Sequence, residues 1–521
     1  MRHARLVTRT LAGVAAAALA VGLGPGLTAA AASPPSSAQQ PLSAQQRAVL
    51  RGIAKDTWAF YGNDVDPHTY LPLDNVGPGT TRGTYTSASN VGVYLWAVVS
   101  AHDLGLITTG EAVSRLRHTL MSVQGLQRTD GFLYQWYDTS TGQVILNPGQ
   151  GACPQVGGTT DNCSFLSAVD NGWYASGLVV VRQALPQLAG LASSLLGQMD
   201  FSIFYDNRAQ TGCNVNADLQ FQPTGQQYGG YYAGVGPAGY HNGALYSDPR
   251  ISMYMGMGLH QMPGDVWWRS WRTLPPKLCA TDPDFSWQGQ WPPQGYWTNI
   301  TDPQSGKVFP VWEGHYTYPG TDLTFVPTYA GGMFEGLMAN EVVPEVQWGP
   351  QSFGLADQRI AQVQIKYATE QLGYPVWGMS PSSTADDTGG YGGFGAAGLK
   401  FPQGQWLAQG PCNGCLPDPE SVVTPHASFL ALAVAPQQAY ANITKLRQLY
   451  PDLYTHDGGF YDAVNPTTGQ VGHRRLVLDQ SMIMAALDNA LNGGQLQHWF
   501  AQDPVSHVAK VYLGVEKMSL D

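Results

Sequence analysis

Residues 89 to 105 read SNVGVYLWAVVSAHDLG, and they give the clearest indication of how the chain folds. The stretch opens on Ser89 and Asn90, which are residue types that favour the start of a helix, and it ends at Gly105, which favours a helix end. Between them lie apolar residues with no charged side chain before Asp103. The pattern predicts a largely buried helix over residues 89–104.

Similar apolar patterns recur along the whole chain, separated by long loops rich in Gly, Pro, Trp and Tyr. We expect further helices over residues 45–61, 110–126, 164–185, 188–204, 248–259, 332–338, 355–372, 423–432, 436–449, 476–491 and 495–501. Strand patterns are few, and residues 129–137 and 458–462 are expected to form short hairpin arms. About twelve helices in pairs favour an all-α fold, an (α/α)6 toroid of two concentric rings whose loops form a cleft.

The N-terminus has the features of a secretory signal peptide. Three arginines (Arg2, Arg5 and Arg9) precede an apolar run over 11–27, and three alanines end at Ala32. No Arg–Arg pair precedes the run, so we expect Sec-type export, cleavage near Ala32 and a secreted, extracellular protein. Residues 33–40 (SPPSSAQQ) are a polar leader that we expect to be disordered. Residues 41–521 contain no long linker and are predicted to be one domain.

Composition limits the class of ligand. Without residues 1–32 the chain has 23 basic and 37 acidic residues, a net charge of −14, which argues against nucleic acid and anionic membranes. No later run of about eighteen apolar residues predicts a membrane span. Charged residues are only 12% of the chain, whereas Trp (15), Tyr (26) and Gly (62) are abundant. Such a surface suits neutral glycans, although a large core with glycine-rich loops has the same composition. We expect a monomer that needs no cofactor.

The chain has six cysteines, and export permits disulfides. Local pairing predicts Cys153–Cys163, Cys213–Cys279 and Cys412–Cys415, although six cysteines allow fifteen connectivities. Cys412 and Cys415 lie in a Pro- and Gly-rich loop with no second CxxC motif, so no metal is predicted there or elsewhere.

The first candidate catalytic residue is Glu335, in the stretch TYAGGMFEGLM (328–338). No basic residue lies within ten positions of it on either side. Desolvation raises the pKa of a carboxyl group in apolar surroundings, which suits a general acid at neutral pH. The alternative is a Glu in the first turn of a helix, stabilised by backbone N–H groups.

The second candidate is Asp248, in the stretch LYSDPRISMY (245–254). Ser247 can cap a helix that has Pro249 in its first turn, and the N–H groups of that turn would keep Asp248 ionised. Asp248 is therefore predicted to be a base or nucleophile, and Glu335 the acid. Two carboxyl groups in unlike environments are typical of glycoside hydrolysis. The alternative for Asp248 is a structural pairing with Arg250 or Arg272.

An ordered set of motifs extends this pattern over most of the chain. They are TSASNVGVYL (86–95) with AHDLG (101–105), VDNGWY (169–174), SDPR (247–250) with MPGDVWW (262–268) and Arg272, GGMFEGLM (331–338), VTPHAS (423–428), GGFYD (458–462) and DQSM (479–482). In this order they resemble the glycoamylase-like domain of cyclic β-1,2-glucan synthases and related secreted bacterial endo-β-1,2-glucanases. The resemblance implies an (α/α)6 fold, hydrolysis of β-1,2-linked glucose, and catalysis by the carboxyl groups at positions 248 and 335.

One departure from that family concerns Asp248, because the family commonly has Glu there. Aspartate is one methylene shorter, which leaves room for a water molecule, so we expect an inverting mechanism with the carboxyl groups roughly 6.5–9.5 Å apart. Glu313, which lies between aromatic residues, is a rival for the role of acid.

Further residues are predicted to contact sugar. Aromatic side chains in loops stack on sugar faces, and polar side chains at helix starts bind hydroxyl groups, although about half of such aromatic residues are expected to fill the core instead. The predicted set is Asn90, Asp170, Trp173, Arg250, Arg272, Trp287, Trp312, Glu313, Tyr329 and Trp377. Two other functions remain open: a non-catalytic glycan-binding relative on the same fold, and a polysaccharide lyase.

Overall fold

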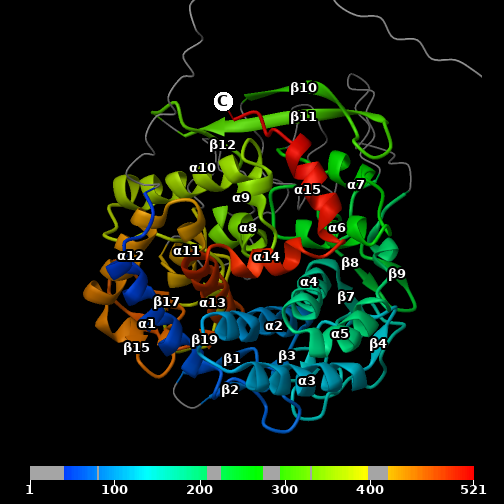
Figure 1. Ribbon diagram of the computed structural model, residues 1–521, viewed down its shortest axis with the longest axis horizontal. Helices are drawn as coiled ribbons and strands as arrows, with labels where there is room; N and C mark the ends of the chain where they lie inside the picture. Colours follow the sequence, from blue (N-terminus) through cyan, green and yellow to red (C-terminus); the bar gives the residue numbers. More distant parts are fainter. Residues whose placement is uncertain are drawn as a thin grey trace, which may run out of the picture. The chain divides into compact units, whose positions relative to one another are not determined.

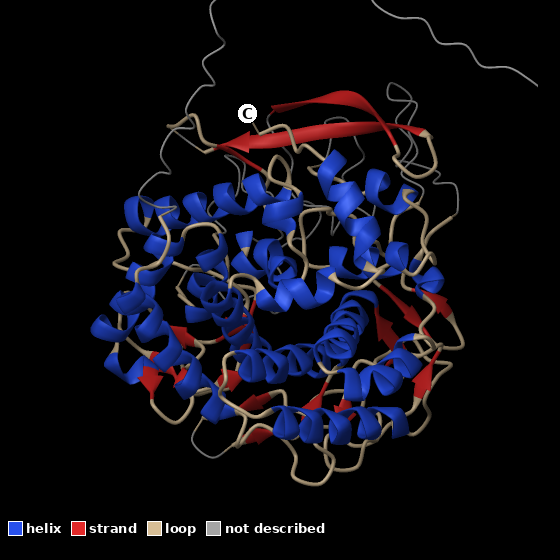
Figure 2. Ribbon diagram, in the orientation of Figure 1, coloured by secondary structure: helices blue, strands red, loops and turns tan. Residues whose placement is uncertain are grey.

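Helices dominate the structure, a computed structural model that describes residues 40–78, 81–207, 225–273, 294–318, 320–328, 331–396 and 421–520 (Figures 1 and 2). Residues 37–521 form one compact unit. The predicted signal peptide and the leader up to residue 39 lie outside the described residues. Among the described residues, no helix has the length and apolarity needed to cross a membrane.

Each predicted helical segment contains a helix. The first half of the chain has α1 (Ala44–Phe60), α2 (Ala88–Asp103), α3 (Thr109–Gly125), α4 (Ala168–Ala184), α5 (Ala189–Leu196), α6 (Arg250–Gly258) and α7 (Asp265–Arg269). The second half has α8 (Met333–Leu337), α9 (Glu345–Trp348), α10 (Phe353–Lys366), α11 (Pro425–Leu430), α12 (Pro436–Leu449), α13 (Val477–Asn492), α14 (Gln495–Ala501) and α15 (Ser506–Val515). Helices α7, α9 and α15 were not predicted. The first two are too short to show a helical period.

Three long helices, α2, α4 and α13, are largely buried. Helix α2 packs between α4 and α13, and α1 and α11 pack on α13 while α5 and α6 pack on α4 (Figure 1). In α2, every residue from Val91 to Ala101 is buried, as its uninterrupted apolar sequence predicts. The helix-rich architecture is therefore confirmed, and the toroid of six helix pairs stays a prediction.

Strands are short except in one hairpin. Strands β10 (Gln294–Thr301) and β11 (Val308–Thr317) pair antiparallel, and β12 (Thr324–Phe325) extends the sheet. Strand β11 contacts α7, and β12 contacts α10 (Figure 1). The prediction that Trp312 lies in a loop is wrong, because it is in β11.

The remaining strands have two or three residues each, and their pairing fixes the loops between helices. They are β1 (Asn75–Val76), β2 (Arg82–Gly83), β3 (Tyr85–Thr86), β4 (Arg128–Thr129), β5 (Phe132–Leu133), β6 (Tyr137–Asp138), β7 (Phe165–Ser167), β8 (Gly230–Tyr232), β9 (Gly236–Pro237), β13 (Ser382–Ser383), β14 (Tyr391–Gly392), β15 (Tyr454–Thr455), β16 (Gly459–Phe460), β17 (Ala463–Val464), β18 (Val471–Gly472) and β19 (Arg475–Leu476). The pairs β4–β5 and β15–β16 confirm the two predicted hairpin arms.

One of the predicted disulfides is present. Cys153 and Cys163 are bonded, with their Cα atoms 5.7 Å apart. The other four cysteines (Cys213, Cys279, Cys412 and Cys415) lie outside the described residues, so their pairing stays a prediction.

Two glycines allow α2 and α4 to touch along their backbones. A Cβ atom at Gly92 would lie 2.5 Å from the carbonyl carbon and oxygen of Trp173, and one at Gly177 would lie 2.6 Å from the oxygen of Gly92. Real Cβ atoms do not approach so closely, so any larger residue must separate the two helices.

We therefore expect Gly92→Ala to lower the free energy of unfolding by about 1–3 kcal/mol, because the added methyl group overpacks the contact. Gly52→Ala is the matched control, because Gly52 is exposed in α1 and a Cβ atom there meets nothing within 4 Å. The control should be neutral or stabilising by up to about 1 kcal/mol. Urea denaturation of both variants measures the difference, and equal stability of the two would contradict the close packing.

Candidate functional site

Asp248 and Glu335 meet at a pocket of about 190 Å³. Asp248 comes from the turn before α6, and Glu335 from the short helix α8. The pocket is lined by Ser167, Val169, Gly229, Tyr240, Asn242, Ala244, Ser247, Asp248, Pro249 and Glu335. The fold thus brings together the two carboxyl groups that the sequence predicted to act on one substrate.

Ser247 links the two carboxyl groups instead of capping a helix. Its Oγ lies 3.2 Å from Asp248 Oδ1 and 3.2 Å from Glu335 Oε2. The prediction that Ser247 caps a helix over residues 248–259 is wrong, because α6 begins at Arg250 and has Pro249 at its N-cap position. Pro249 fixes the backbone of the turn and keeps Asp248 outside the helix.

The two carboxyl groups are hydrogen-bonded to each other. Burial raises the pKa of Asp248, and burial together with the charge of Asp248 raises the pKa of Glu335 well above its usual value. Two carboxylates in contact cannot both ionise without a large cost, so the pair holds one proton near neutral pH. The greater upward shift gives that proton to Glu335. The expected separation of 6.5–9.5 Å is therefore wrong, since the groups are in direct contact.

Asp170 is a third acid beside the pair. It lies in the first turn of α4, next to the pocket-lining Val169, and its Oδ2 accepts a hydrogen bond of 3.0 Å from Gln135. Burial, with a contribution from the charge of Asp248, raises the pKa of Asp170 to about 6. The structure thus places Asp170 where the charge of Asp248 acts on it, and its predicted sugar contact stays a prediction.

Arg250 does not fit its predicted role as a sugar contact, because it is completely buried and its donors are engaged within the protein. Its Nε and one terminal nitrogen bind the carboxylate of Glu345, at 2.7 and 2.8 Å. The other terminal nitrogen donates to the backbone oxygens of Ser247 (2.9 Å) and Glu335 (3.1 Å), and Gly336 accepts a further bond. Arg250 is therefore a positioning residue that ties together the two segments that carry the acids.

Arg272, Trp312 and Glu313 form a separate buried group away from the pocket. Arg272 pairs with Glu516, and the indole of Trp312 donates to Thr273 at 3.2 Å. Burial and the charge of Glu516 raise the pKa of Glu313 to about 7, and Arg272 opposes the shift. None of the three lines this pocket, so its lining gives no support to their predicted sugar contacts or to Glu313 as rival acid, and these roles stay predictions.

The predicted aromatic and amide contacts are also mostly internal. Trp173 is only 2% exposed and packs edge-on against Trp96, and Trp377 is 5% exposed. Both therefore belong to the core. Asn90 is 3% exposed and donates to Asp74 at 2.9 Å. Trp287 and Tyr329 lie outside the described residues, so their roles stay predictions.

Sequence reasoning missed Tyr240 and Asn242 as residues of the pocket wall. They precede Asp248 by eight and six positions, in the loop that leads to it. Tyr and Asn side chains are common sugar-binding groups, so their nearness to Asp248 in sequence was the available signal.

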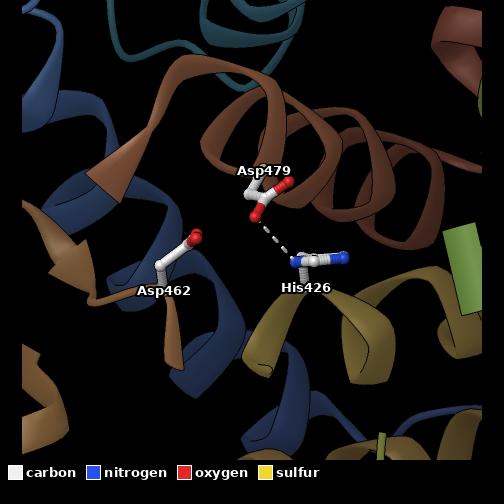
Figure 3. Close-up of side chains that lie close together, drawn as sticks. All are labelled: His426, Asp462 and Asp479. Carbon is white, nitrogen blue, oxygen red and sulfur yellow. Dashed lines mark ion pairs between the residues drawn. The ribbon is translucent and has the colours of Figure 1, made fainter. Parts of the chain in front are cut away.

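A second group of titratable residues could hold a metal ion. His426 in α11, Asp462 after β16 and Asp479 in α13 each offer a ligand atom, and these atoms lie within 4.8 Å of one another (Figure 3). The three residues come from three separate motifs, so no local spacing pattern indicated a cluster.

Comparison with known proteins finds two family models that match different parts of the chain. The model Glycoamylase, described as "Putative glucoamylase", matches residues 311–504, and DUF3131, described as a protein of unknown function, matches residues 52–240. The cyclic β-(1,2)-glucan synthase NdvB of Rhizobium meliloti is 24% identical over 542 residues, covering 89% of this chain and 18% of NdvB. The chain thus spans less than a fifth of that relative.

Two solved structures have the same fold over nearly their whole length. A Bacteroides caccae protein, described in the same words as the Glycoamylase model, has a TM-score of 0.63 and 18% identity, with 91% of this chain and 100% of that chain covered. An endo-β-1,2-glucanase from Chitinophaga pinensis, solved with sophorotriose and glucose, has a TM-score of 0.61 and 16% identity, with coverages of 91% and 98%. The resemblance seen in the sequence motifs is thereby confirmed.

The Arg250–Glu345 pair generates a prediction about stability. Glu345→Gln leaves a buried guanidinium without its counter-charge, which should cost about 3–5 kcal/mol of the free energy of unfolding. Glu370→Gln is the control, because Glu370 pairs with Lys366 on the surface at 3.2 Å. Loss of a surface pair should cost less than about 1 kcal/mol. Similar losses in the two variants, measured by urea denaturation, would show that the buried pair does not hold the site together.

Proposed function

We propose that this protein is a secreted, monomeric glycoside hydrolase on an (α/α)6 toroid, and that it cleaves a neutral glucan, most readily β-1,2-glucan. The observation that carries the proposal is that Asp248 and Glu335 line one pocket with Ser247 Oγ 3.2 Å from an oxygen of each carboxyl group. A pair of carboxyl groups of unlike pKa is the catalytic device of most glycoside hydrolases.

Glu335 is the general acid in this proposal. Its raised pKa keeps it protonated at neutral pH, so it donates a proton to the glycosidic oxygen as the bond to the leaving sugar breaks. Asp248 remains ionised and faces the developing positive charge at the anomeric carbon.

The carboxyl groups lie too close together to leave the gap for water that an inverting base needs, which favours a nucleophilic role for Asp248. A carboxylate that activates water on the opposite sugar face needs a gap of roughly 6.5–9.5 Å, whereas a nucleophile needs about 5 Å. Asp248 would bond to the anomeric carbon, and Glu335, now ionised, would remove a proton from the water that releases the sugar. The product would keep the configuration of the substrate, which NMR of the fresh product determines.

The proposed substrate follows from the pocket and from the similar proteins. The lining contains no Lys, Arg or His, which suits a neutral sugar and argues against a lyase that acts on uronates. The Chitinophaga pinensis protein is an endo-β-1,2-glucanase, and NdvB is a cyclic β-(1,2)-glucan synthase. We therefore take β-1,2-glucan as the first substrate to test.

We expect Glu335→Gln to lower kcat on β-1,2-glucan by about 10²–10⁴-fold, because the amide cannot donate the proton. Asp248→Asn should lower it to a similar extent, with KM little changed in both. Glu313→Gln is the control, because Glu313 is equally buried but lies away from the pocket.

The outcome separates two claims. Near-normal activity of Glu335→Gln on a substrate that the parent cleaves would remove Glu335 as the acid. No cleavage of any neutral glucan by the parent, together with saturable glucan binding, would favour the non-catalytic glycan-binding alternative.

A pH profile tests the electrostatic coupling to Asp170. The plot of activity against pH should be bell-shaped, since protonation of Asp248 stops activity at low pH and ionisation of Glu335 stops it at high pH.

The negative charge of Asp170 favours the protonated form of Asp248, so Asp170→Asn should lower the pKa of Asp248. The acidic limb then moves to lower pH, by up to about one unit. Asp452→Asn, at an exposed position in the turn after α12, should leave the profile unchanged. An acidic limb that stays in place in Asp170→Asn would contradict the coupling.

A further inference from the structure

The cluster of His426, Asp462 and Asp479 is buried at the junction of three segments. Each of the three side chains is 1–2% exposed. His426 Nδ1 lies 3.2 Å from Asp479 Oδ2, and the Asp462 carboxylate points toward both (Figure 3). The Thr424 hydroxyl oxygen lies 2.8 Å from the same Nδ1, so it adds a fourth donor atom.

The described residues offer few hydrogen-bond donors to the buried carboxyl groups of Asp462 and Asp479. Asp462 Oδ2 accepts a hydrogen bond of 2.7 Å from the backbone N–H of Ser383. Asp462 Oδ1 and both oxygens of Asp479 have no hydrogen-bond donor among the described residues, and the two carboxyl groups lie within hydrogen-bonding distance of each other. A buried carboxylate without a partner is costly, and buried charges in proteins are paired or coordinate metals.

Among the described residues, Arg474 and Arg475 are held by other acceptors, although the positive charge of Arg474 still acts on Asp479. Arg474 contacts Asp74 at 3.8 Å and donates to the Gly389 oxygen, and Arg475 donates to Thr455 and to backbone oxygens. His426 Nε2 points away from the cluster and is buried without a partner among the described residues, so Nδ1 is the ring nitrogen that faces the two carboxyl groups (Figure 3).

A sugar does not fit this site. The unpartnered oxygens are buried, and none of the three residues lines the described pocket. A ligand that reaches them must be small and positively charged, or the two carboxyl groups must share a proton.

We propose that His426, Asp462 and Asp479 bind a divalent transition-metal cation of the zinc or manganese class. Imidazole nitrogen with carboxylate oxygens is a donor set that these ions accept, whereas calcium and magnesium prefer oxygen alone. The Nδ1–Oδ2 distance of 3.2 Å is close to the spacing of two ligands that each lie about 2.0–2.1 Å from one zinc ion. This departs from the expectation that the chain holds no metal.

The ion would act as a structural link beside the catalytic pair. It would join α11, the loop after β16 and α13, and the His426 ring lies against Phe334, the neighbour of Glu335, with ring centroids 6.5 Å apart. The proposal does not depend on the proposed function, because metal binding is measured without a substrate.

The test is calorimetric titration of the purified, EDTA-treated mature protein with ZnCl₂, MnCl₂ and CaCl₂. We expect one saturable site for zinc or manganese with a rise in Tm, and weaker binding of calcium. His426→Ala and Asp462→Asn should each weaken binding at least tenfold. Asp488→Asn should not; Asp488 is an equally buried acid on α13 with a bond to Asn492.

Two results would overturn the proposal. One is the absence of saturable binding of all three cations to the parent protein, which would mean that the carboxyl groups share a proton. The other is zinc or manganese binding that His426→Ala and Asp462→Asn leave unchanged. If those variants do not fold, anomalous diffraction from crystals of the parent grown with zinc decides, because an ion at the cluster supports the proposal and its absence there rejects it.

Discussion

The buried Arg250–Glu345 ion pair is the interaction on which the rest of the site depends. Glu345 holds the guanidinium in place, and the guanidinium in turn holds the backbone oxygens of Ser247 and Glu335. A guanidinium group can satisfy several acceptors at fixed angles, which a lysine cannot. The segments that carry Asp248 and Glu335 lie far apart in the sequence, and Arg250 holds them side by side so that the two carboxyl groups meet. Arg250 binds backbone atoms of these segments, so the path of the chain does not depend on which acidic residue occupies position 248.

The sequence predicted the features that local patterns determine. The helix at residues 89–104 was evident because buried apolar residues follow one another without interruption, and Glu335 stood out because no basic residue is near it. The Cys153–Cys163 bond followed from short spacing. These signals lie within a single stretch of chain, where spacing and chemistry can be read directly.

Features that depend on distant partners could not be predicted in this way. The ion pair of Arg250 with Glu345 and the contact of Trp173 with Trp96 each join residues from separate segments, so no local pattern shows that these two side chains are engaged within the protein. The wide separation expected of the two carboxyl groups rested on the length of aspartate alone. The distance between the two carboxyl groups also depends on how close the fold brings the two backbone segments, which side-chain length does not show. The cluster at His426 was missed for the same reason, since each ligand comes from a different segment.

Ser247 has one hydroxyl proton and two carboxyl neighbours at equal distance. The hydroxyl can donate to only one of them at a time, and it favours whichever carries the negative charge. Its rotation must therefore follow the negative charge, from Asp248 to Glu335, when Glu335 gives up its proton and Asp248 bonds to the sugar. The orientation of the Ser247 O–H bond therefore shows which of the two carboxyl groups is ionised. Neutron diffraction at two pH values would locate that hydrogen atom.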